Sequence, residues 1–110
     1  MARDDKKKEH KLAKSILNTV LSVPGVARMS TDSIAENLNK VVLRKPDIEG
    51  VYIYWEDDDR LNVDLDIISV YGANIPQISY DVQSKVKEML EQKYGEKVRA
   101  INIFVEGVER

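Results

Sequence analysis

The chain has 110 residues, of which 43% are hydrophobic and 33% are charged, and its formal net charge is −2. This composition is typical of one folded domain with a highly charged surface and argues against intrinsic disorder. The absence of cysteine excludes disulfides, thiolate zinc sites and a cysteine nucleophile. No apolar run approaches the ~20 residues of a membrane span or has the pattern of a signal peptide, which predicts a cytoplasmic protein.

Charge is unevenly distributed along the chain. Residues 1–46 contain ten Lys or Arg and five Asp or Glu, whereas residues 47–110 contain seven and fourteen. Such polarity can steer a charged partner or favour self-association. A chance difference between two solvated faces explains it equally well, so we retain both interpretations.

The N-terminal part of the chain predicts two helices. Residues 1–9 are polar and are expected to form a frayed tail, followed by a single domain over 10–110. Apolar residues with helical spacing predict a first helix from about residue 8 to 22, which Pro24 and Gly25 end. Capping residues and a second apolar face predict another helix over 31–44, which ends before Pro46.

Two alternating segments then predict a β-hairpin. Residues 50–56 and 61–67 alternate between apolar and other side chains, and the acidic run 57–60 between them is typical of a turn. The alternation breaks where Ile67 and Ile68 adjoin. A β-bulge, or burial of both faces, would explain that break.

The third helix has the clearest boundaries, and it connects two strands. Asn74 is a good N-cap, Pro76 suits the first turn, and Gly95 suits the C-terminal end. Gly72 gives the backbone freedom for the exit from the preceding strand. A last strand is predicted over 97–108, and a helix of this length suits a crossover between parallel strands.

These elements predict a two-layer α/β (α+β) sandwich. The order is α-α-β-β-α-β, with helices packed on a mixed three-stranded sheet.

The segments VYGANIP, VQSKVKEML and VRAINIFVEGV occur in this order, after an earlier VPGVARMS. Together they resemble the alkaline shock protein family, small cytoplasmic proteins of Gram-positive and related bacteria. The matching positions are Tyr71, Gly72, Asn74, Ile75, Pro76, Val82, Gln83, Val86, Lys87, Asn102, Val105, Gly107 and Val108.

The resemblance implies a non-enzymatic accessory, scaffold or regulatory protein in the envelope stress response or envelope homeostasis. Such a protein would act through protein–protein contacts. Some members of the family lie beneath the membrane through an anchored partner, which implies a membrane-proximal location, and others are linked to lipid metabolism. The family has no established catalytic residues, and the resemblance implies no cofactor.

The residues themselves give little sign of catalysis or metal binding. The chain has one histidine, His10, and no Ser-His-Asp arrangement can be built around it. The acidic run 57–59 is interpreted as a solvated turn, and Asp64 and Asp66 are expected to be exposed on the sheet. We therefore assign no catalytic, cofactor-binding or metal-binding residue.

A partner surface is predicted on the sheet face turned away from the apolar residues. Alternation places six residues on that face, and strand order decides whether they adjoin: Tyr52, Tyr54, Asp64, Asp66, Asn102 and Phe104. Exposed aromatic side chains rimmed by carboxylates would suit a protein partner. Ordinary cross-strand pairing, or cover by an N-terminal helix, is the alternative.

Two other ligands are weighed against a protein partner. A KH-like RNA-binding module is the alternative function, but the sequence has no Gly-x-x-Gly loop and no basic stripe, so nucleic acid is disfavoured. The first helix has lysines beside an apolar stripe, which could lie on anionic lipid. The stripe has no large aromatic anchor and is better explained as core, so direct membrane binding is also disfavoured.

Overall fold

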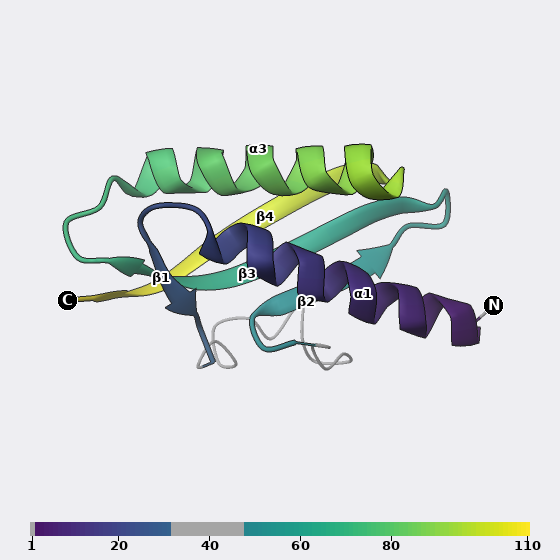
Figure 1. Cartoon of the computed structure of the whole chain (residues 1–110), viewed down its shortest axis with the longest axis horizontal. Coiled ribbons are helices and arrows are strands. Elements are labelled where there is room, and N and C mark those ends of the chain that lie inside the picture. The colour runs from purple at the N-terminus through teal and green to yellow at the C-terminus, as the bar shows by residue number, and fades with distance from the viewer. Residues whose placement is uncertain (1, 32–47) are drawn as a thin grey trace.

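The structure, a computed structural model, describes residues 2–31 and 48–110 (Figure 1). Two helices cover one face of a mixed sheet, which confirms the predicted α+β class. The helix predicted over 31–44 lies outside the described residues. The elements, in chain order, are α1 (Ala2–Leu21), β1 (Val26–Met29), β2 (Val51–Trp55), β3 (Arg60–Val70), α3 (Ile75–Tyr94) and β4 (Lys97–Glu109).

The sheet is built around the long strand β3. Strands β2 and β1 pair antiparallel with successive parts of one edge of β3, and β4 pairs parallel along the other edge. The predicted hairpin and the predicted parallel crossover are both confirmed. The register between β3 and β4 shifts between Ile67 and Ile68, where the sequence left a bulge or burial of both faces as alternatives, and it shifts again between Leu61 and Asn62.

The strand β1 was not predicted, so the sheet has four strands where the sequence predicted three. Its segment, Val26–Met29, is too short to reveal an alternating pattern. The strand is held by its pairing with β3, in which Val26 lies opposite Ser69 and Met29 opposite Ile67. Long-range pairing of this kind leaves no local signal in the sequence.

The helix α1 begins at Ala2, several residues before the predicted start, in the segment expected to be a frayed tail. Lys and Glu are good helix formers, so a polar run can extend a helix whose later turns are anchored in the core. Leu12, Ile16 and Val20 are fully buried. The apolar stripe of α1 is therefore part of the core, as predicted.

The helix α3 has the predicted boundaries and caps. The Asn74 side chain accepts a hydrogen bond from the Gln77 backbone N–H at 3.1 Å. Gly95 ends the helix at φ 68°, and its N–H donates to the Glu91 carbonyl at 3.1 Å. The Gln77 side chain donates to Asp81 at 2.9 Å, so only the Asn74 half of the capping box forms.

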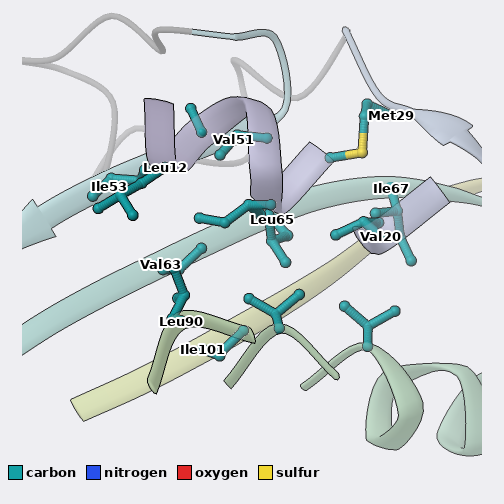
Figure 2. Packing of buried hydrophobic residues seen from close by; sticks show 14 of the residues in the cluster. Leu12, Val20, Met29, Val51, Ile53, Val63, Leu65, Ile67, Leu90 and Ile101 are labelled. Carbon is teal, nitrogen blue, oxygen red and sulfur yellow. The ribbon is translucent and has the colours of Figure 1, made fainter. Parts of the chain in front are cut away.

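The core lies between the helices and the inner face of the sheet (Figure 2). Alternate residues of β3 form the sheet side of the core, and α1 and α3 each pack an apolar stripe against them. The main contributors are Leu61, Val63, Leu65 and Ile67 from β3, Leu12, Ile16 and Val20 from α1, and Ile78, Val82, Val86 and Leu90 from α3. The opposite face of β3 carries Asn62, Asp64 and Asp66, so any polar partner surface must begin there.

Candidate partner surface

The six residues predicted to form a partner surface occur on one face of the sheet. Because β3 lies between β2 and β4, the register brings residues from all three strands into rows across the sheet. Tyr52, Asp64 and Asn102 form one such row. Tyr54 lies opposite Asn62, and Phe104 lies opposite Asp66 in the neighbouring rows. The strand order therefore makes the predicted residues neighbours.

The expected exposure of the two aspartates is wrong. Asp64 and Asp66 are buried, at 4% and 0% relative exposure, and Tyr52 is buried with them. The Asp64 carboxylate accepts a hydrogen bond from the Asn102 side chain at 2.8 Å. Alternation shows which face of a strand a side chain occupies, but it does not show whether that face is covered. The exposed members of the predicted surface are Asn102 and Phe104, both on β4.

A polar network joins β2, β3 and β4 at the hairpin end of this face. The Asn62 side chain donates to the Glu56 carboxylate at 2.7 Å and accepts from the Arg99 guanidinium at 3.3 Å. Asn62 is buried, so both of its hydrogen bonds are needed to offset the loss of water. These residues therefore position the strands and are not offered to a partner.

The acidic turn of the hairpin is solvated, as predicted. Asp57, Asp58 and Asp59 are all exposed. Hydrogen bonds from the Arg60 backbone N–H at 3.2 Å and from its side chain at 2.7 Å lower the pKa of Asp58. Within the described ranges, no group of His, Asp and Glu side chains is arranged to hold a metal ion.

A polar pocket of about 430 Å³ lies where α1, β2 and the turn before β4 meet. The Glu96 carboxylate on its wall is buried and uses both oxygens. One accepts from the Lys8 ammonium at 2.8 Å, and the other accepts from the Trp55 indole N–H at 3.4 Å. These contacts connect α1, β2 and the turn before β4. We therefore interpret Glu96 as a structural residue that holds these three elements together, and call this set of contacts the Glu96 clasp.

Glu96→Ala is expected to lower the free energy of unfolding by about 1–2 kcal/mol, because it leaves the half-buried Trp55 indole N–H without its acceptor and removes a buried carboxylate that joins three elements. Half-exposed Lys8 regains water, which limits the cost. Urea unfolding measures the change. The control is Glu91→Ala, which removes only the exposed Lys87–Glu91 pair at 3.6 Å and should cost less than about 0.5 kcal/mol. Equal effects of the two substitutions would contradict the clasp.

An exposed apolar cluster, missed in the sequence, lies at the C-terminal ends of β3 and β4. We call Val70, Tyr71 and Val108 the strand-end patch; they are 42%, 61% and 59% exposed. The backbone brings all three to the same end of the sheet, because Val108 pairs with Ser69 and the Tyr71 N–H donates to the Glu109 carbonyl at 2.7 Å. Val70 pairs with Glu109, so Val70 and Val108 point to opposite faces of the sheet at this end. The Arg110 guanidinium lies 4.6 Å from the centre of the Tyr71 ring.

The remaining family-like positions have mainly structural roles. Asn74 caps α3, Pro76 lies in its first turn, and Ile75 is half-buried against the core. Gly72 has a φ of 83° in the turn after β3. At Gly107, an added Cβ would lie 3.4 Å from the Ile68 side chain, so glycine allows that close approach.

Comparison with known proteins identifies a protein family that the chain matches and two similar bacterial proteins. A family model for alkaline shock proteins, described as having a cell envelope-related function, matches residues 6–110. The chain is 31% identical over 86 residues to the uncharacterized protein Spy1535 of Streptococcus pyogenes (serotype M6), covering 78% of this chain and 64% of that protein. It is 31% identical over 83 residues to the uncharacterized protein YloU of Bacillus subtilis (strain 168), covering 76% and 68%.

The chain thus spans about two thirds of the length of these curated relatives. No solved structure matches it. Neither of the two described helices is long and apolar enough to cross a membrane.

Proposed function

The chain belongs to the alkaline shock protein family, whose function is related to the cell envelope, and we propose that it is a non-enzymatic accessory protein acting there through protein–protein contacts. The observation that carries this proposal is the strand-end patch. Exposed Tyr71, with an arginine stacked on its ring, and the exposed valines Val70 and Val108 at the same strand ends have the composition of a small protein interface.

The geometry of the patch favours a rigid recognition surface. Tyr71 follows directly on β3, its N–H is tied to the end of β4, and Arg110 covers one side of its ring. Little side-chain freedom would be lost when a partner covers this tyrosine, which lowers the cost of binding. The partner we propose is an envelope protein with an apolar contact surface, and a membrane-anchored one would hold the chain beside the membrane.

A protein partner is favoured over lipid because the apolar stripe of α1 is buried. Leu12, Ile16 and Val20 have no exposed surface, so α1 cannot turn an apolar stripe to a membrane, and its exposed Leu21 (46%) is a single apolar side chain at the end of the helix. The predicted alternative, RNA binding, would need aromatic side chains beside a basic surface. In the described residues the aromatic Tyr52 is buried beside the carboxylate of Asp64, and no observation favours that alternative.

Affinity purification from the native cell tests the proposal with two matched variants. Tyr71→Ala removes the centre of the strand-end patch, and Tyr80→Ala removes an equally exposed tyrosine from the outer side of α3. Both substitutions are on the surface and should change stability by less than about 0.5 kcal/mol. We expect the amount of an envelope protein captured with Tyr71→Ala to be at least about tenfold lower than with the wild type, as measured by quantitative mass spectrometry. We expect Tyr80→Ala to capture the same amount as the wild type.

Two results would contradict the proposal. One is an identical set of captured proteins for Tyr71→Ala and the wild type. The other is recovery of RNA alone, at low salt and sensitive to added salt, which would support the RNA-binding alternative.

A further inference from the structure

The residues of β4 can be matched to their pairing partners on β3, starting from the middle of the strand. Positions at equal distances on either side of the middle then carry similar or complementary residues. Ile103 pairs with Leu65 at the centre. Reading outward, the paired positions on the two sides are Asn102 and Phe104, Ile101 and Val105, Ala100 and Gly107, Val98 and Val108, and Lys97 and Glu109. Arg99 and Glu106 are the extra residues at the two register shifts, one on each side. The two charged residues at equivalent positions, Lys97 and Glu109, have opposite signs.

The outer edge of β4 is open in the part of the chain that the structure describes. The strand is 13 residues long and pairs with β3 along one edge, and no other described strand pairs with it. An edge of this length presents a row of backbone N–H and C=O groups to an incoming strand. A groove of about 310 Å³ between α3 and the first half of β4 leaves space beside the edge.

We propose that β4 pairs antiparallel with β4 of a second copy of this chain, about a two-fold axis at Ile103. In this dimer Ile103 lies opposite the same residue of the second copy, and Lys97 lies opposite Glu109 of the second copy. Such an interface uses one surface twice, as closed two-fold dimers do.

Charge complementarity selects a second copy in this orientation. Parallel pairing would place Lys97 beside Lys97 and Glu109 beside Glu109, and like charges directly opposite destabilise a strand pair. Antiparallel pairing places opposite charges at both ends of the interface. Lys97 is exposed and forms no ion pair with another described residue, so it is available. Glu109 holds Arg28 at 3.1 Å and is still 45% exposed, so it can accept a second cation.

The apolar part of the strand also fits this pairing. Ile101 meets Val105 of the second copy, and half-buried Ile103 is covered by its symmetry mate. Phe104, which is 37% exposed, gains cover from Asn102 of the second copy. The Gln83 side chain donates to the Ile101 carbonyl at 2.9 Å. A carbonyl oxygen has two lone pairs, so this bond leaves room for one from the second strand.

The inference goes beyond the proposed envelope function and does not rest on it. The dimer would cover Val108 of the strand-end patch, so its test uses Lys97, Glu109 and Ile103, which are not members of that patch. Loss of dimerisation with an intact envelope partner, or the reverse, separates the failure of one proposal from the failure of the other.

Charge reversal tests the register, with sedimentation equilibrium of the full chain as the measurement. We expect a dimer for the wild type at micromolar concentration and dimerisation at least about tenfold weaker for Lys97→Glu and for Glu109→Lys, since each creates two like-charge pairs. An equimolar mixture of the two variants should recover the dimer, because opposite charges then face each other. A wild type that is monomeric even at a concentration of about 100 μM, or an undiminished Lys97→Glu dimer, would overturn the proposal.

A single introduced cysteine tests the axis, because the chain has none of its own. Ile103→Cys should give a disulfide-linked dimer under mild oxidation. Directly opposed residues in an antiparallel pair have Cβ atoms about 4.5–5.5 Å apart, and a local shift of about 1 Å brings them to the ~3.5–4.5 Å of a disulfide. Ser84→Cys, on the exposed side of α3, is the control and should remain largely uncrosslinked. Equal crosslinking of the two variants would place the contact elsewhere and overturn the pairing.

Discussion

Leu65→Ala is expected to lower the free energy of unfolding by about 3–5 kcal/mol, the upper part of the range for buried leucines. Leu65 lies in the middle of β3, is fully buried, and is surrounded by residues from both helices and the neighbouring strands. In Figure 2 its side chain lies between those labelled on α1 and β4. The helices and strands around it are fixed by other contacts, so they cannot close over the cavity.

Urea unfolding of the purified chain measures this effect, with Val70→Ala as the control. Val70 belongs to the same strand but is 42% exposed, so its truncation should cost less than about 1 kcal/mol. A domain of this size has a total stability of about 5–15 kcal/mol, so Leu65→Ala should be close to unfolded at elevated temperature. A difference of less than about 1 kcal/mol between the two variants would contradict the central place of Leu65 in the core.

Gly25→Ala is expected to lower the free energy of unfolding by about 2–4 kcal/mol, because two costs add at this residue. Its φ of 100° lies in the left-handed region, where a side chain is strained. An added Cβ would also lie 2.6 Å from the Ile78 Cδ1 atom, and Ile78 is buried in the core. The Ile78 side chain or the turn that contains Gly25 must therefore shift.

Gly72→Ala separates the two costs. Gly72 has a φ of 83°, yet no atom lies within 4 Å of an added Cβ. This variant should therefore show only the backbone cost, about 1–2 kcal/mol. Thermal unfolding of both variants makes the comparison, and equal losses would show that the approach of Ile78 to Gly25 is unimportant.

Local signals predicted the second half of the fold well. Asn74, Pro76 and Gly95 act within a few residues of themselves, so they fixed the ends of α3 without any knowledge of the rest. The alternation on either side of the acidic turn predicted the hairpin for the same reason, and the adjacent Ile67 and Ile68 marked the register shift.

The elements that depend on distant pairing were not predictable. The strand β1 is four residues long and exists through its ladder with β3, so nothing in its own sequence identifies it. The early start of α1 depends on the anchoring of its later turns in the core. Both errors concern cooperation between distant segments, which propensity and periodicity do not measure.

The candidate surface was predicted in part. Alternation placed Tyr52, Asp64 and Asn102 on one face, and the strand order makes them neighbours. It could not show that Asp64 is buried. The strand-end patch was missed for the opposite reason, since Tyr71 and Val108 are apolar and belong to the family-like segments, and this suggested structural positions. Their exposure depends on where the two strands end together.

We propose that the envelope-related function of the chain depends on the strand-end patch. The most direct measurement is growth of a strain lacking the native gene under envelope stress, complemented by the wild type, Tyr71→Ala or Tyr80→Ala at equal protein levels. We predict that Tyr71→Ala fails to restore growth, although it folds and accumulates normally, and that Tyr80→Ala restores it fully. Full restoration by Tyr71→Ala would contradict the claim.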